Sequence, residues 1–229
     1  TNTGDQAFSS CTSLAGVAIG SGVTSIGKNS FEYCSSLAHI EIPNSVKTIG
    51  DNGFQHCTNL SVLTIGSGVI SIGVGAFESC LLLTSVVIPD SVTRIGYGAF
   101  YGCTNLTSVM IGSGVTNIGL SAFKYCTSLT SVVIPDSVTD IEAWAFQYCS
   151  GLTNVEIGSG IVQIGICALA DCSSLACVFF TGNAPGVASN TFSSSPPTIY
   201  YRSETSGWPA IPDRWAGRPT ALWDSLDFE

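Results

Sequence analysis

The ten cysteines of this chain are its most reactive residues, because thiols can form disulfides or bind metals. Eight recur at steps of 23 residues, at Cys11, Cys34, Cys57, Cys80, Cys103, Cys126, Cys149 and Cys172. Side chains at one repeat position point the same way instead of at each other, so we expect a ladder of buried free thiols. Ladder disulfides are the alternative. Cys167 and Cys177 lie off the ladder and could pair with each other or with Cys172.

The remaining residues do not show the spacing expected of a catalytic site or a metal site. The chain has two histidines, His39 and His56, and no C-x-x-C pair, so we predict no metal site. A catalytic triad needs a histidine with an orienting acid. The repeat places His39 on an outward strand position beside Glu41 and His56 on the opposite face of the next coil, and we interpret both as exposed surface histidines. The Gly-Ser-Gly turns lack the G-K-[ST] of a phosphate loop. We therefore predict a protein that is not an enzyme and needs no cofactor.

A row of turn residues raises the question of calcium. Asn44, Asp90 and Asp136 share one turn position at intervals of 46 residues. Two coils separate neighbours in that row, or roughly 10 Å at sheet spacing, whereas calcium needs about six to eight oxygens at 2.3–2.6 Å. We expect these side chains to stabilise turns.

The glycosylation sequons at Asn59 and Asn105 have a ladder leucine in the middle, and we interpret them as incidental to the repeat.

The elements that position these side chains follow from a repeat of 23 residues. Its clearest marker is a ladder of phenylalanines at Phe8, Phe31, Phe54, Phe77, Phe100, Phe123 and Phe146, with Leu169 and Phe192 at the next two steps. A fixed period of this length is typical of a solenoid, in which each unit buries its core against its neighbours. The repeat therefore predicts one elongated domain with an extended surface.

One coil, residues 122–141, shows how the unit is built. From Ala122 to Cys126 the apolar residues are three and four apart, which predicts about one helical turn. From Leu129 to Ile134 part of the segment alternates apolar and polar residues, which predicts a short strand. The following turn is Gly-Ser-Gly in odd coils and Pro-Asn-Ser or Pro-Asp-Ser in even coils. This alternation indicates that the duplicated unit was 46 residues long.

These residues resemble the leucine-rich repeat of bacterial surface proteins, the BspA-like or Treponema-type class. Its pattern runs roughly L-x-x-I-x-I-P-x-S-V-x-x-I-G-x-x-A-F-x-x-C, and the likeness covers residues 3–180. The resemblance implies an α/β repeat solenoid, a right-handed superhelix with a parallel concave sheet and short convex helical turns. It also implies an adhesin-like interaction module that binds host or matrix proteins, at the cell surface or outside the cell.

We divide the chain into a solenoid over residues 1–180 and a capping segment over residues 181–229. Thr3-Gly4 stands where later coils carry Ile-Gly, so we expect the first coil to be truncated. Prolines and three tryptophans, Trp208, Trp215 and Trp223, follow residue 181. Large aromatic side chains can each bury about 150–250 Å², which suits a lid over the open end of a solenoid. A carbohydrate-stacking patch and a docking edge for a following domain are the alternatives.

The composition narrows the range of partners. The net charge is −9 and the seven basic residues are spread along the chain, so we predict no nucleic acid partner. No apolar run approaches the length of a membrane-spanning helix, so we predict no membrane insertion. We expect a monomer that binds another protein.

The outward strand positions of the concave face form the candidate binding site. Apolar Val62, Val87, Met110 and Val133 occupy the middle, with Thr64 among them, and His39, Glu41, Asn154 and Glu156 stand at the flanks. A contiguous apolar patch on a surface often marks a protein contact. Alternatively, the valines only satisfy β-propensity, and the protein is a structural spacer that projects other domains.

Overall fold

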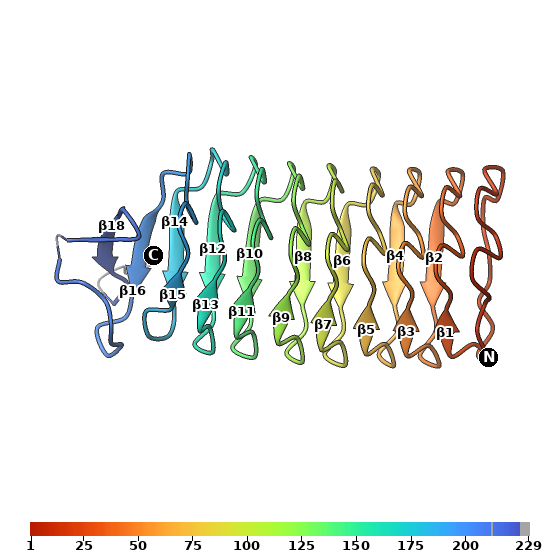
Figure 1. Ribbon diagram of the computed structural model, residues 1–229, viewed down its shortest axis with the longest axis horizontal. Helices are drawn as coiled ribbons and strands as arrows, with labels where there is room; N and C mark the ends of the chain where they lie inside the picture. Colours follow the sequence, from red (N-terminus) through yellow and green to blue (C-terminus); the bar gives the residue numbers. More distant parts are fainter. Residues whose placement is uncertain (212, 225–229) are drawn as a thin grey trace.

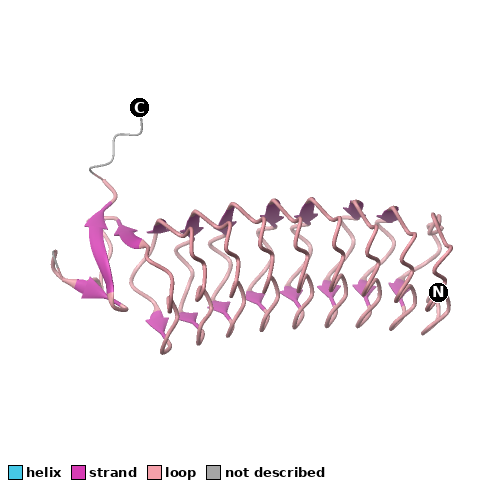
Figure 2. Ribbon diagram, turned by 90° about the horizontal axis from the view of Figure 1, so that it is seen from above, coloured by secondary structure: helices cyan, strands magenta, loops and turns pink. Residues whose placement is uncertain are grey.

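The computed structural model describes residues 1–211 and 213–224 and shows a row of stacked coils, with the first coil and the strands β16 (Thr198–Tyr201) and β18 (Arg218–Leu222) at opposite ends of the row (Figure 1). A typical coil contributes one long and one short strand, and each strand pairs in parallel with its counterparts in neighbouring coils. Seen from above, the long and short strands form two separate rows along the molecule (Figure 2). The result is a β-solenoid of leucine-rich-repeat length.

The strands have the following bounds. The long strands are β2 (His39–Ile42), β4 (Val62–Ile65), β6 (Ser85–Ile88), β8 (Ser108–Ile111), β10 (Ser131–Ile134), β12 (Asn154–Ile157), β14 (Cys177–Phe180) and β16 (Thr198–Tyr201). The short strands are β1 (Ser25–Ile26), β3 (Thr48–Ile49), β5 (Ser71–Ile72), β7 (Arg94–Ile95), β9 (Asn117–Ile118), β11 (Asp140–Ile141), β13 (Gln163–Ile164) and β15 (Gly186–Val187). At the carboxyl end, β17 (Arg214–Trp215) pairs antiparallel with β18 (Arg218–Leu222), which continues the long-strand row beside β16.

The repeat sets the register of both rows. Val132 of β10 pairs with Val155 of β12, and Ile49 of β3 pairs with Ile72 of β5, each 23 residues further along the chain. Residues at one repeat position therefore stack as ladders through the molecule. The predicted alternation is confirmed in the long strands, where β6, β8 and β10 each show exposed, buried, exposed and buried residues in turn.

Two ladders run through the core. The phenylalanine rings from Phe8 to Phe146 stack nearly parallel, with neighbouring ring centroids 5.1–5.4 Å apart. The cysteines run beside them, and the thiol of Cys103 donates a hydrogen bond to the carbonyl oxygen of Phe77 in the preceding coil at 3.2 Å. The same bond recurs at the other ladder cysteines from Cys34 to Cys172. Cys11 is exposed, so the expectation of eight buried ladder thiols is wrong for this one.

The predicted convex helical turns are absent from the described residues, where the Ala-Phe-x-x-Cys segments form successive tight turns instead. Two positions per coil have a positive φ, such as Asn52 at 53° and His56 at 58°. Left-handed residues interrupt a right-handed helix and aim alternate amides at the next coil. The amide of Phe54 donates to Ala76 of that coil at 2.8 Å, whereas the amide of Cys57 donates back to Phe54 at 3.3 Å. The spacing of apolar residues correctly predicted the buried face but not this path.

The coils are joined in pairs, in keeping with the 46-residue alternation of turns. The glycine turns at residues 66–68, 112–114 and 158–160 lie tightly on the proline turns before them. A methyl group at Gly114 would lie 1.9 Å from the carbonyl oxygen of Asp90, so only glycine fits there. The carboxylate of Asp90 accepts hydrogen bonds from the amide of Ser113 at 2.7 Å and from its hydroxyl at 3.0 Å. Asp136 and Ser159 repeat this arrangement.

The opposite contacts, from a glycine coil to the following proline coil, are looser. All four residues of β6 pair with β8, whereas β10 pairs with β8 through one residue, and within the described chain β4 and β6 belong to different sheets. Proline has no amide hydrogen, so Pro89 and Pro135 cannot extend the ladder from the coil before them. The two kinds of turn therefore decide where the long-strand sheet is continuous.

Beyond residue 180 the chain first adds another coil and then covers its end. Phe192 and Ser195 are buried at the phenylalanine and cysteine positions, and the hydroxyl of Ser195 donates to the carbonyl oxygen of Leu169 at 2.7 Å. The rings of Trp208 and Trp215 then lie 4.9 and 5.4 Å from the ring of Phe180. These two tryptophans occupy the place expected of a lid.

Candidate functional site

The outward residues of the long strands form two lanes that run across the strands, and we call this side the long-strand face. The first lane consists of His39, Val62, Ser85, Ser108, Ser131, Asn154 and Cys177. The second lane consists of Glu41, Thr64, Val87, Met110, Val133, Glu156, Phe179 and Tyr200. The first lane is mostly small and polar, whereas the second is mostly apolar beyond β4.

The predicted apolar centre is present in part. Val87, Met110 and Val133 follow one another in the second lane and are 56%, 64% and 57% exposed. Val62 is also exposed but lies in the first lane, where it pairs with His39. Exposed His39 and Glu41 lie together at the amino-terminal end of the face on β2, and Thr64 is exposed on β4. The contiguous apolar patch is therefore the row Val87, Met110 and Val133.

The carboxyl-terminal end of the face carries an aromatic cluster that sequence reasoning missed. The ring of Phe179 stacks on that of Tyr200 with centroids 4.9 Å apart, and lies 5.1 Å from the indole of Trp223. The guanidinium of Arg202 lies 4.8 Å from the indole centroid, as a cation–π contact. Trp223 thus contacts the second lane instead of joining the lid. The available signal was the occurrence of two successive aromatic residues, Phe179 and Tyr200, in the second lane after Glu156.

Two adjoining hollows flank this cluster. One has a volume of about 580 Å³, and its wall includes Asn154, Phe179 and Trp223. The other, of about 650 Å³, lies toward the turns and includes Asp136, Arg202 and Glu204. Val133 and Glu156 line both hollows. The structure therefore brings three predicted residues, Val133, Asn154 and Glu156, into one concave region with the aromatic cluster.

Charges in this region are mostly negative. The larger hollow is lined by three carboxylates, Asp136, Glu156 and Glu204, and by one guanidinium, Arg202. Arg202 lies 3.9 Å from Glu204 and Asp136 accepts hydrogen bonds from Ser159. Within residues 1–211 and 213–224, no hydrogen bond or ion pair reaches the carboxylate of Glu156. Glu156 is therefore a carboxylate of this region whose oxygens can accept hydrogen bonds from an external ligand.

The other candidates for chemistry are structural. Burial raises the pKa of the Cys103 and Cys172 thiols to about 12, so these sulfurs stay protonated near neutral pH. The ring of His56 stacks on that of Tyr33 with centroids 4.6 Å apart, and neither residue belongs to the two lanes. Hydrogen bonds from the amide and hydroxyl of Ser113 lower the pKa of Asp90, as expected for a turn-stabilising carboxylate. No group of acids, cysteines and histidines in the described chain could hold a metal ion.

Repeat length, parallel strand rows and turn chemistry define a solenoid of the leucine-rich-repeat class. The sequence pattern of the BspA type leucine rich repeat region matches residues 1–105 and 71–199 in six copies. The chain belongs to this family, as the sequence analysis expected.

Solved structures agree with this assignment. The chain resembles a leucine rich repeat protein of T. pallidum, with 29% identity, a TM-score of 0.65, and coverage of 70% of this chain and 78% of that one. A leucine-rich repeat protein from Bacteroides ovatus has 23% identity and a TM-score of 0.55, over 78% of this chain and 59% of that one. A leucine rich cell surface protein from Faecalibacterium prausnitzii has 22% identity and a TM-score of 0.53, over 97% and 82%. No curated protein sequence matches the chain.

Within residues 1–211 and 213–224, the structure contains no helix that is long and apolar enough to cross a bilayer. Leucine-rich repeat proteins in general serve as interaction modules or scaffolds, and this chain has the fold for either role.

Proposed function

We propose that this protein is a non-enzymatic interaction module that binds another protein through its long-strand face. The observation that carries the proposal is the apolar row of Val87, Met110 and Val133, whose side chains are more than half exposed. Hydrophobic centres with polar surroundings are the usual anatomy of a protein interface. Serines on one side and Glu156 at one end supply such surroundings.

The setting we propose is the surface of a bacterium or the space outside it, in an adhesin-like protein. The support is the family, whose solved relatives come from bacteria, and the relative from F. prausnitzii that is described as a cell surface protein. A rigid row of coils would also hold such a surface away from its anchor. A spacer without its own ligand is the competing function, and the experiment below separates the two.

Charge substitution in the apolar row tests the proposal. The double variant Val87→Arg, Met110→Glu places two charges at the centre of the row without touching the core. We expect the parent protein to capture a partner from host matrix or cell-surface extracts, and the variant to lose at least about 90% of it, since central interface residues dominate binding.

A matched control comes from another part of the coils. Ile70 and Val162 are 46% and 63% exposed and lie outside the two lanes, so Ile70→Arg, Val162→Glu carries the same change of charge. The control should capture as much partner as the parent. Equal capture by the lane variant, or no specific capture by the parent, would contradict the proposal and favour the spacer.

A further inference from the structure

The hollows around Glu156 deepen the proposed function, because they indicate the chemistry of the partner. A carboxylate that is partly withdrawn from water and has no partner gains most from a cation that can reach it. Glu156 is half-buried between Val133 and Phe179 in the second lane. An apolar or anionic group of a partner placed there would leave the negative charge of Glu156 without a counter-charge.

The aromatic cluster favours one kind of cation. Guanidinium groups are planar, so they stack on aromatic rings and also form paired hydrogen bonds with a carboxylate, whereas an ammonium group does only part of this. The structure already shows one guanidinium, that of Arg202, at 4.8 Å from the indole of Trp223. The hollow of about 580 Å³ is thus lined by the rings of Phe179 and Trp223 together with the unpaired carboxylate of Glu156.

We infer that the Glu156 hollows bind an arginine side chain of a partner protein. This inference rests on the proposed function, since it supposes a protein ligand on the long-strand face. The guanidinium would bind Glu156 beside the rings of Phe179 and Trp223, and the arginine stem would lie on Val133. The local excess of carboxylates over Arg202 and the net charge of −9 complement such a ligand.

Small probes test the hollow without knowledge of the partner. Acetyl-arginine amide is titrated into the full chain, and the indole N–H signal of Trp223, assigned with Trp223→Phe, is followed by NMR. Acetyl-citrulline amide has nearly the same shape without the charge and is the matched probe. We expect a saturable shift with arginine only, weakened by added salt because the contact is electrostatic.

Variants locate the contact. Glu156→Gln should weaken arginine binding roughly tenfold or more, as for loss of a charge-assisted bond. Asp140→Asn removes a carboxylate from β11, on the short-strand row of the same solenoid, and should leave the affinity within about twofold. Equal binding of citrulline, or unchanged affinity in Glu156→Gln, would overturn the inference. So would an equal Trp223 shift with cellohexaose in the parent and in Glu156→Gln, which would indicate a glycan site.

The two proposals fail in different ways. Partner capture that depends on Val87 and Met110, without any arginine-specific shift at Trp223, overturns the arginine site and leaves the proposed function standing. An arginine-specific shift in a chain that captures no protein overturns the proposed function instead.

Discussion

At Cys103 and its counterparts, a thiol serves as a small hydrogen-bond donor inside the core. Each buried ladder cysteine from Cys34 to Cys172 donates to a phenylalanine carbonyl of the preceding coil. Ser195 makes the equivalent bond to Leu169, which shows that the position needs a small donor and not sulfur chemistry. The cysteines are therefore best understood as part of the packing.

Thiol reactivity should follow this division. In the folded protein only Cys11, Cys167 and Cys177 have exposed or partly exposed side chains, and the other seven are buried. Burial raises the pKa of Cys103 to about 12, so its reactive thiolate is scarce at pH 8. We expect at most three thiols to react with a maleimide in native buffer and all ten after denaturation. Labelling of a fourth thiol in native buffer, or ladder disulfides found by mass spectrometry, would contradict the buried ladder.

At the scale of elements, the turns decide how neighbouring strands join. A glycine turn allows its coil to approach the preceding proline turn, as at Gly114 against Asp90. A proline turn ends the backbone ladder to the coil before it, since Pro89 has no amide hydrogen. Paired coils are thus the structural unit of the long-strand sheet.

Adding a methyl group should separate these effects. Gly114→Ala would force Cβ to 1.9 Å from the Asp90 carbonyl oxygen, and overpacking of this kind costs about 1–3 kcal/mol. Gly22 has the same turn position in the first coil, yet a Cβ there meets nothing within 4 Å. We expect Gly22→Ala to change the free energy of unfolding by less than about 0.5 kcal/mol. Similar urea midpoints for the two variants would rule out close turn packing as the reason for glycine.

At the scale of the whole molecule, the last coil of a solenoid has no following coil to bury its apolar side chains, so another segment must cover them. The rings of Trp208 and Trp215 pack on Phe180, which is fully buried. Trp223 instead packs on Phe179 at the long-strand face. The carboxyl-terminal segment therefore both closes the core and extends the candidate binding surface.

Variants of the tryptophans should show the two roles. Trp208→Ala should lower the melting temperature because it uncovers Phe180, whereas Trp223→Ala should leave it nearly unchanged.

Truncation after Thr181 should expose the coil end and make the chain associate, as light scattering after gel filtration would show. A truncated chain that stayed monomeric and melted like the parent would contradict the role of the segment as a lid.

The sequence by itself determined the repeat, the ladders, the strand alternation and the family, because identical spacing places identical residues in register. It also identified Val87, Met110 and Val133 as outward residues, since alternation along a strand decides which side chains face out. The path of the Ala-Phe-x-x-Cys segments was not determined in this way. A helical turn and a left-handed tight turn bury the same apolar residues, and hydrogen bonds to the next coil decide between them.

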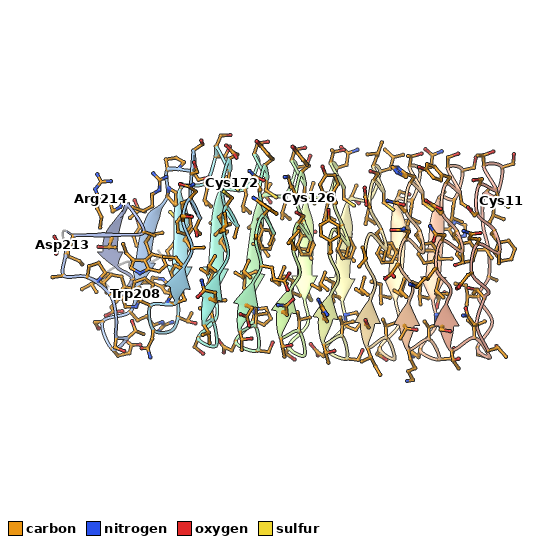
Figure 3. The ribbon with its side chains drawn as sticks, in the orientation of Figure 1. Cys11, Cys126, Cys172, Trp208, Asp213 and Arg214 are labelled. Carbon is orange, nitrogen blue, oxygen red and sulfur yellow. The ribbon has the colours of Figure 1, made fainter. Side chains whose placement is uncertain are left out.

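Only the tertiary structure decided what lies beside Glu156. Its neighbours Val133 and Phe179 come from adjacent coils, and Trp223 reaches the same wall from the far end of the chain. Repeat spacing places residues within the coils but says nothing about a segment outside the repeat. Trp223 directly follows β18, which pairs with β16 and extends the long-strand row at the carboxyl-terminal end. Figure 3 labels Trp208, Asp213 and Arg214 at this end of the molecule. The hollow thus depends on contacts between parts of the chain that have no common period.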